Sequence, residues 1–129
     1  MTVGRSNPKT VILVEQDVAS RDAFQRALTE AGFAVLCFPD YSGPLKIAES
    51  DSRLDLLITG IRLPAGTPHG VSLAAMMHMR RPRLPVLFIA EDGAIAQMIG
   101  DDTPVLVKPI DPFGLIQAAA QLTGEPGSS

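Results

Sequence analysis

Five short apolar runs are spaced along the chain, and each is followed by a segment with helix signals; at 18–31 these include a stripe of Phe24, Ala27, Leu28 and Ala31. The apolar runs are rich in β-branched residues and contain few polar positions, which is typical of strands buried on both faces of a sheet. The predicted strands span residues 10–14, 33–38, 56–59, 85–90 and 105–107. The predicted helices span residues 18–31, 44–49, 71–80, 94–99 and 112–122.

Capping residues and helix breakers place the ends of the predicted helices. Asp17 is the predicted N-cap of the first helix, and Gly32 is its predicted left-handed end. Pro44 fits the first turn of the second helix, and Asp111 followed by Pro112 opens the last one. The fourth helix is expected to be short, because glycines and a proline surround it.

The alternation of strands and helices predicts a parallel sheet that helices cover on both faces, with right-handed crossovers. Five such units fit an α/β fold of the flavodoxin-like type: a (βα)5 three-layer sandwich whose parallel sheet has strand order 2-1-3-4-5. In such sheets the binding site lies outside the carboxyl ends of the strands. The folded domain is predicted to span residues 9–123, with flexible tails at 1–8 and 124–129.

Composition narrows the classes of partner and compartment. The 129 residues suffice for one domain, and the net charge of −3 argues against direct binding to nucleic acid. No apolar stretch approaches the length that spans a bilayer and no signal peptide opens the chain, so neither membrane attachment nor export is expected. Cys37 is the only cysteine, which favours the reducing cytoplasm, and we interpret it as a small buried hydrophobic residue.

The ends of four strands carry recognisable motifs. The first strand runs into an acidic cluster at 11–17 (VILVEQD), and the third runs into a loop at 55–64 (DLLITGIRLP). The fourth strand occupies 85–90 (PVLFIA), and the fifth leads to a lysine and a proline at 107–113 (VKPIDPF). Together and in this order, the four motifs resemble the receiver domain of two-component response regulators, the CheY-like family. The resemblance extends over about residues 10–122.

The resemblance implies a phosphorylation pocket at the strand ends. In that family, two acidic residues after the first strand and an aspartate after the third hold Mg²⁺, and the aspartate accepts a phosphoryl group from a phosphohistidine. A lysine after the fifth strand pairs with this aspartate, while a hydroxyl after the fourth strand and an aromatic side chain on the fifth respond to the phosphoryl group. The matching positions in this sequence are Glu15, Gln16, Asp17, Gly60, Arg62, Ala90, Val105 and Lys108.

Four of these positions depart from the family pattern. Gly60 stands where the aspartate would accept the phosphoryl group, and Gln16 stands where the second acidic residue would bind the metal. Ala90 replaces the hydroxyl residue and Val105 replaces the aromatic one. We therefore interpret the chain as a degenerate receiver, or pseudo-receiver, without a phosphoacceptor. Thr59 is not a substitute, because its side chain is expected on the opposite face of the sheet from that of its neighbour.

The charges that remain predict weak or absent Mg²⁺ binding. Glu15 and Lys108 sum to about zero, whereas three carboxylates and one lysine would sum to about −2. Mg²⁺ sheds its water reluctantly, so a neutral pocket attracts it little. Glu15 is the one residual metal candidate, and it is expected to pair with Lys108 within ~4 Å. No cofactor is predicted.

A receiver without an acceptor is predicted to act by binding a protein and not as an enzyme, since no catalytic or cofactor motif is present. The partner would belong to a two-component pathway: a histidine kinase, a phosphotransfer protein or an output domain, with a homodimer as a further option. The expected contact surface lies on the fourth helix, fifth strand and fifth helix, at Ile95, Met98, Val105, Pro109 and Phe113. The alternative function is the sensing of a small molecule in the emptied pocket.

Overall fold

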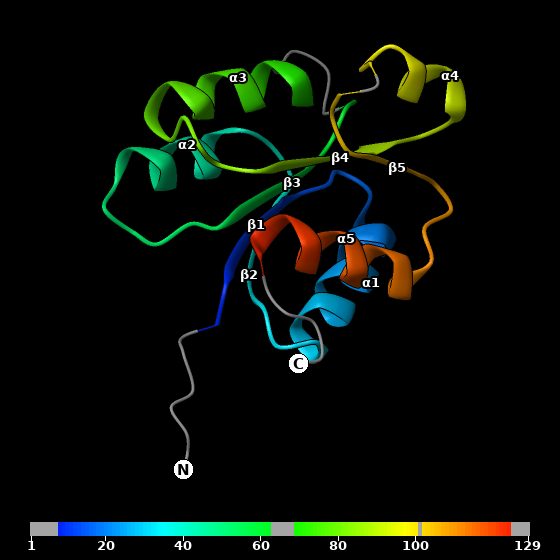
Figure 1. The fold of residues 1–129 in the computed structure, drawn as a ribbon, viewed down its shortest axis with the longest axis horizontal. Helices are drawn as coiled ribbons and strands as arrows, with labels where there is room; N and C mark the ends of the chain where they lie inside the picture. Colours follow the sequence, from blue (N-terminus) through cyan, green and yellow to red (C-terminus); the bar gives the residue numbers. More distant parts are fainter. Residues whose placement is uncertain (1–7, 63–68, 101, 125–129) are drawn as a thin grey trace.

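The computed structural model describes residues 8–62, 69–100 and 102–124. Strands and helices alternate through them in the predicted order (Figure 1). The elements are β1 Thr10–Val14, α1 Val18–Glu30, β2 Ala34–Phe38, α2 Ser42–Glu49, β3 Leu56–Gly60, α3 Gly70–Arg80, β4 Val86–Ala90, α4 Gly93–Gln97, β5 Val105–Val107 and α5 Pro112–Thr123. The two predicted tails fall almost entirely outside the described residues, so their flexibility stays a prediction.

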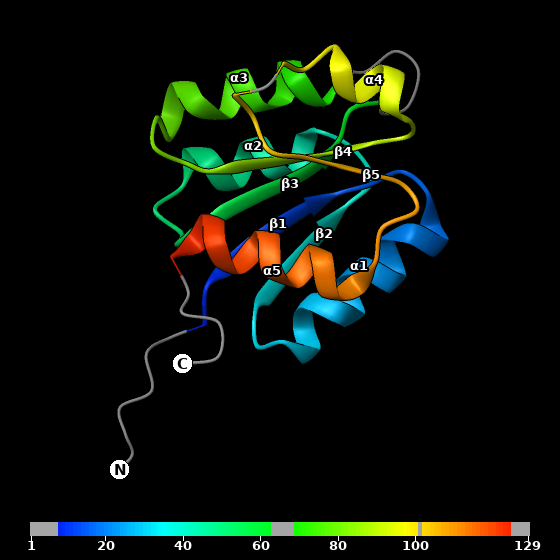
Figure 2. The ribbon, with the colours of Figure 1, turned by 45° about the vertical axis from the view of Figure 1, so that its right-hand side comes forward.

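The five strands form one parallel sheet in the order β2-β1-β3-β4-β5, which confirms the predicted fold. Helices α1 and α5 pack on one face, while α2, α3 and the short α4 pack on the other (Figure 2). Strand β1 is fully buried from Val11 to Val14 and contributes to both cores: Val11 and Leu13 pack beneath α1 and α5, and Ile12 and Val14 pack beneath α2 and α3. Both faces of β1 are buried, so the side chains at consecutive positions of this strand must all be apolar.

The helix ends follow most of the predicted signals. The side chain of Asp17 accepts a hydrogen bond from the backbone N–H of Ser20 at 2.9 Å, and Gly32 has a φ of 101°. Helix α2 begins two residues earlier than predicted, because Pro44 sits within a first turn whose N–H groups need no helical partner. Helix α4 has five residues, which confirms that it is short. None of the helices in the described ranges is both long and apolar enough to cross a membrane.

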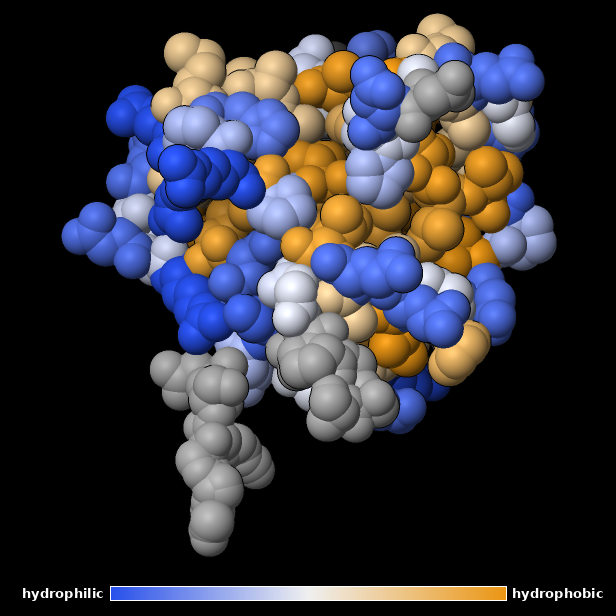
Figure 3. Space-filling view, viewed as in Figure 1, coloured by the Kyte–Doolittle hydropathy of each residue, from blue (hydrophilic) through white to orange (hydrophobic). Residues whose placement is uncertain are grey.

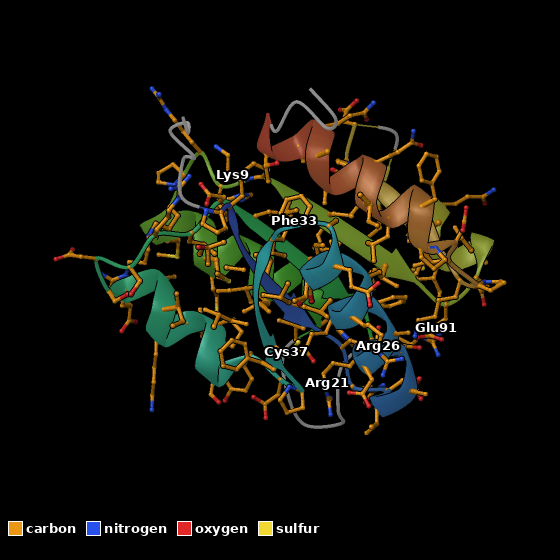
Figure 4. The ribbon with its side chains drawn as sticks, turned by 90° about the horizontal axis from the view of Figure 1, so that it is seen from below. Lys9, Arg21, Arg26, Phe33, Cys37 and Glu91 are labelled. Carbon is orange, nitrogen blue, oxygen red and sulfur yellow. The ribbon has the colours of Figure 1, made fainter. Side chains whose placement is uncertain are left out.

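Cys37 is half-buried, which corrects the prediction that it is a small buried hydrophobic residue. Its strand, β2, is the edge strand next to β1, and Leu36 there is 40% exposed. Figure 4 shows Cys37 on β2 close to Arg21 of α1. Burial raises the pKa of the Cys37 thiol, which keeps it protonated and unreactive at neutral pH.

Gly70 allows the start of α3 to approach the end of β3. Its N–H donates to the carbonyl of Ile61 at 2.8 Å, and a Cβ at this position would overlap the carbonyl oxygen of Gly60. The overlap is with backbone, which cannot rotate away as a side chain could. Gly70 therefore determines how closely α3 packs against the strand that ends at the binding edge of the sheet.

We expect Gly70→Ala to lower the free energy of unfolding by about 2–3 kcal/mol, because the added methyl group forces two backbone segments apart. Gly114→Ala in α5 is the matched control, since a Cβ there meets nothing within 4 Å. Its higher helix propensity should raise the free energy of unfolding by up to about 1 kcal/mol. Urea unfolding followed by circular dichroism measures both variants, and equal stabilities would contradict the close approach.

Candidate functional site

The carboxyl ends of β1, β3, β4 and β5 meet at one edge of the sheet. Glu15 follows β1, and Gly60 ends β3. Glu91 follows β4, and Lys108 follows β5. Figure 4 shows Glu91 at this edge and Lys9, which precedes β1, at the opposite edge. A depression of about 770 Å³ opens where the four strand ends meet, lined by Gln16, Asp17, Ser20, Arg62, Glu91 and Lys108.

Glu15 is a buried carboxylate beside this depression, with 2% of its surface exposed. Its Oε2 accepts hydrogen bonds from the backbone N–H of Asp17 at 3.0 Å and from Nζ of Lys108 at 3.1 Å. The guanidinium of Arg21 donates to the backbone carbonyl of Glu15 at 2.7 Å. These contacts compensate the cost of burying the charge. Its Oε1 is buried and has no hydrogen-bond partner among the described residues.

Lys108 links two carboxylates from different strand ends. Its Nζ lies 3.1 Å from Oε2 of Glu15 and 3.3 Å from Oε2 of Glu91. Burial by itself would lower the pKa of Lys108, but the hydrogen bonds and negative charges of Glu15 and Glu91 outweigh it, so this pKa is held above its ordinary value of 10.5. Glu15 is the main partner, because its side chain is 3% exposed and that of Glu91 is 46% exposed.

A side chain at position 60 would point toward this ion pair. A Cβ built on its backbone would lie 3.6 Å from Oε1 of Glu15 and 3.7 Å from the carbonyl oxygen of Arg62. These are ordinary van der Waals distances, so the position has room for a side chain. Thr59 lies next to Phe88 in the sheet and faces the core beneath α2 and α3, as predicted. Its buried hydroxyl donates to the carbonyl of Gly60 at 2.8 Å.

The family model of the response regulator receiver domain matches residues 11–120. The chain belongs to that family. A response regulator receiver protein from Sinorhizobium medicae WSM419 is 26% identical, with a TM-score of 0.80 over 91% of this chain and 95% of that one. The receiver domain of the hybrid histidine kinase CckA is 28% identical, with a TM-score of 0.73 over 88% of this chain and 98% of that one.

A third similar structure, chemotaxis protein CheY4 from Vibrio cholerae, has the same fold as this receiver at 22% identity. Its TM-score is 0.75, and the match covers 89% of this chain and 98% of that one. None of the curated proteins matches the chain in sequence. The comparisons therefore establish the receiver fold and family, while the chemistry of the pocket follows from this chain's own residues.

The receiver pocket brings together most of the predicted positions. Those that line or border the depression are Glu15, Gln16, Asp17, Gly60, Arg62 and Lys108. Ala90 is fully buried at the end of β4, and Val105 is half-buried against the core beneath α2 and α3. Neither of these two residues lines the depression. Asp17 is exposed, and its hydrogen bonds from Ser20 hold its pKa below the ordinary value.

Sequence reasoning did not single out Glu91, Ser20 or Arg21. Glu91 directly follows β4, so the strand-end argument that places Lys108 in the pocket could also have placed Glu91 there. Ser20 and Arg21 belong to the first turn of α1. Their place near the strand ends follows from the short connection between β1 and α1, but no motif in the sequence marks these two side chains.

The donor set does not fit the octahedral oxygen shell that Mg²⁺ requires. Oε2 of Glu15 is engaged by Lys108, and Oε1 of the same side chain is shut off from solvent. Gln16 is neutral, and Gly60 offers no side-chain oxygen. Within 8–62, 69–100 and 102–124, no group of three or more His, Cys, Asp or Glu side chains is arranged to hold a metal ion. Weak Mg²⁺ binding stays a prediction, and this donor set supports it.

The predicted contact surface needs one correction. Met98 and Phe113 are 82% and 63% exposed, Pro109 is also exposed, and Val105 is half-buried. Ile95 is 6% exposed, because it lies on the one apolar face by which the short α4 packs against the core. Ile95 is therefore not available to a partner. An exposed valine of β5, at position 107, extends the surface instead.

We expect Lys108→Met to lower the free energy of unfolding by about 3 kcal/mol at neutral pH, because it leaves the buried carboxylate of Glu15 without its charge partner. Lys46→Met is the matched control on an exposed part of α2, with an expected change within about 0.5 kcal/mol. Adding Glu15→Gln to Lys108→Met should cost less than the sum of the two single changes, since the pair acts as a unit. Additive losses would contradict the pairing.

The stability that Lys108→Met removes should depend on pH in one direction. The raised pKa means that the folded state holds the proton of Lys108 more tightly than the unfolded state does. The contribution of the ion pair is therefore complete below pH 10.5 and declines as the pH rises through the folded-state pKa. The stability difference between the native chain and Lys108→Met should be constant around neutral pH and shrink in alkaline solution. A difference that grows with alkaline pH would be inconsistent with the raised pKa.

Proposed function

We propose that this receiver domain serves two-component signalling by binding a protein partner, and that it does not carry a phosphoryl group. The observation that supports this most strongly is the glycine that ends β3. From Gly60 a side chain would extend toward Oε1 of Glu15 and the carbonyl oxygen of Arg62, where an acceptor carboxylate would reach the pocket. Glycine carries only a hydrogen atom in place of that side chain, so the end of β3 provides no nucleophile.

Other oxygen-bearing side chains along β3 and around the pocket are poor substitutes for the acceptor. Thr59 is fully buried on the other face of the sheet. Asp55 lies at the opposite end of β3, where its carboxylate accepts a hydrogen bond from a backbone N–H of β1. Asp17 caps α1, and Glu91 is bonded to the ammonium of the pocket lysine. Each group is held by a structural contact and not poised for attack on phosphorus.

The parts that would transmit phosphorylation are also changed. In the family pattern, a hydroxyl after the fourth strand and an aromatic side chain on the fifth move together. Here Ala90 has no hydroxyl, and Val105 has a compact side chain packed against the core. A switch requires an element with two discrete arrangements. We therefore propose one constant contact surface, regulated by the level of the partner or by other parts of the protein.

The proposed partner is a histidine kinase, a phosphotransfer protein or an output domain, and the proposal includes no enzymatic activity. The similar CckA receiver comes from a hybrid histidine kinase. Another similar structure, from Pseudomonas fluorescens Pf-5, is the receiver domain of an HD domain-containing protein. We propose that the present chain likewise works beside another signalling domain.

A second candidate function is the sensing of a small molecule at the strand ends. The depression of about 770 Å³ supports it, because cationic Arg62 and Lys108 share its wall with anionic Asp17 and Glu91. Such a wall suits a polar metabolite. A thermal-shift screen of metabolites separates the two functions: a ligand that raises the melting temperature of the native chain but not that of Arg62→Ala would favour sensing.

The direct test of a silent pocket is incubation of the native chain with acetyl phosphate and Mg²⁺, followed by intact mass measurement. We expect the mass to stay unchanged, because no carboxylate occupies the end of β3. A receiver known to be phosphorylated serves as the positive control in the same reaction. Stoichiometric gain of one phosphoryl group would overturn the proposal.

Restoring the acidic positions should restore part of the metal site. Millimolar Mg²⁺ should leave the melting temperature of the native chain unchanged, and should raise that of the Gly60→Asp, Gln16→Asp double variant, since ligands that bind only the folded state stabilise it. The Gly60→Asn, Gln16→Asn variant has the same size without the added charges and should not respond. A rise in the melting temperature of the native chain itself would show that its pocket still holds the ion.

A further inference from the structure

Strand β2 is an unprotected edge of the sheet. It pairs only with β1 among the described strands, in an unbroken register, and its five residues at 34–38 (AVLCF) include no charged residue, glycine or proline. Edge strands in natural proteins usually carry a charge, a proline or a bulge that prevents pairing with another chain. β2 has none of these, and Pro39 directly after it stops any pairing at that end. The edge is therefore open to one short strand.

The hydrogen bonds to β1 determine which backbone groups of β2 point outward. The N–H of Ala34 donates to the residue before β1 at 2.9 Å, and the C=O of Phe38 accepts from the residue after β1 at 3.1 Å. Residues at the even positions of β2 therefore direct their backbone groups toward β1. Val35 and Cys37 lie between them and direct theirs away from the sheet. Each of these two residues offers one N–H and one C=O to a further strand.

The outward groups match those of a second copy of the same strand. When two copies of β2 run antiparallel about a two-fold axis at Leu36, Val35 of each copy lies opposite Cys37 of the other. Each of these two pairs exchanges two N–H···O=C bonds, so every outward group within β2 is used. Leu36 then faces the same residue of the second copy in a pair without hydrogen bonds, where the Cα atoms lie about 4.5 Å apart.

The side chains of β2 suit the same arrangement. Val35 and Cys37 pack against the core beneath α1 and α5, so Leu36 points to the other face of the sheet, where it is 40% exposed. Pairing would shield the two Leu36 side chains against each other, and apolar cross-strand pairs stabilise antiparallel sheets. The larger hydrophobic area, over β5 between α4 and α5 (Figure 3), lies at the opposite edge of the sheet and takes no part.

Helix α1, which packs against β2, carries opposite charges at matching places. Asp22 and Arg26 are exposed and lie two residues on either side of Phe24, the middle residue of the helix. The helix is about 20 Å long and β2 about 17 Å, so their midpoints lie at nearly the same level. A two-fold axis at Leu36 reverses the second α1 and brings Asp22 of each copy to the level of Arg26 in the other. The charges across the axis are then complementary.

We propose that this receiver forms a two-fold dimer through β2, in which two five-stranded sheets join into one continuous sheet. The inference goes beyond the proposed function, because it involves neither the pocket nor the predicted contact surface. It adds a property to that surface: the dimer carries one copy at each outer β5 edge. A partner with two receiver-binding sites is then held more tightly than a single contact allows.

Sedimentation velocity of the full chain in reducing buffer measures the dimer. We expect the sedimentation coefficient to rise from that of a monomer to that of a dimer between about 1 μM and about 1 mM protein. Leu36→Lys should stay monomeric over this range, because two ammonium groups would meet at the axis. Val107→Lys is the matched control, since this valine is 39% exposed on the other edge strand, and it should dimerise like the native chain. Circular dichroism verifies that both variants are folded.

A cysteine at the axis tests the register without adding a charge. In the double variant Leu36→Cys, Cys37→Ser, the two thiols of a dimer face each other within reach of a disulfide. We expect mild oxidation to convert this variant into a covalent dimer on a non-reducing gel. In the native chain Cys37 lies opposite Val35 and diagonal to its own copy, beyond the reach of a disulfide, so no covalent dimer should form.

Exchange of charges tests the contact between the helices. Asp22→Arg and Arg26→Asp should each weaken the dimer about three- to tenfold, because each sets like charges across the axis. The variant that carries both changes restores opposite charges and should dimerise like the native chain. Equal weakening in the single and double variants would contradict the predicted helix contact.

Four results would overturn the inference: a monomer at every concentration, aggregates without a defined dimer, a dimer that Leu36→Lys leaves intact, or a dimer that Val107→Lys abolishes. The proposed function is decided separately, because acetyl phosphate tests the pocket and neither β2 nor α1 supplies the acceptor position. A chain that gains a phosphoryl group and dimerises through β2 loses the silent pocket alone. A chain that gains none and stays monomeric loses the dimer alone.

Discussion

The ion pair between Glu15 and Lys108 holds the pocket edge of this receiver together. It joins the ends of β1 and β5, which are separated in the sheet by β3 and β4. Both side chains are largely shielded from water, so each charge depends on the other to offset the cost of its burial. In the family pattern the lysine would serve an aspartate at the end of β3. Here Gly60 provides no aspartate, and the lysine pairs instead with Glu15 after β1 and Glu91 after β4.

This arrangement links the pocket to the proposed mode of action. In the proposed function the lysine is already neutralised, so we expect the pocket to attract Mg²⁺ weakly, and Gly60 offers no acceptor for a phosphoryl group. On this proposal Ala90 and Val105 have no phosphorylation signal to transmit, so the contact surface is proposed to be constant. The exposed apolar residues of the predicted contact surface, among them Val107 and Phe113, come from the last two βα units of the chain.

Much of this architecture could be predicted from the sequence, because buried parallel strands must be apolar throughout and their ends must lie at one edge. The Glu15–Lys108 pair followed from the same reasoning combined with the charge balance of the pocket. Other features depend on topology that no local pattern encodes. Cys37 is half-buried because β2 lies at the edge of the sheet, and Ile95 is buried because the five-residue α4 has only one face to anchor it.

The side-chain ammonium of Lys108 reports most directly on the central claim, that this lysine is occupied by Glu15 in place of a phosphorylated aspartate. Its nitrogen can be followed by ¹⁵N NMR while Mg²⁺ and acetyl phosphate are added to the native chain, with Lys108→Arg used to assign the signal. We expect this signal not to move, because the ion pair persists. A saturable shift of that signal would show instead that the pair opens to admit a metal or a phosphoryl group.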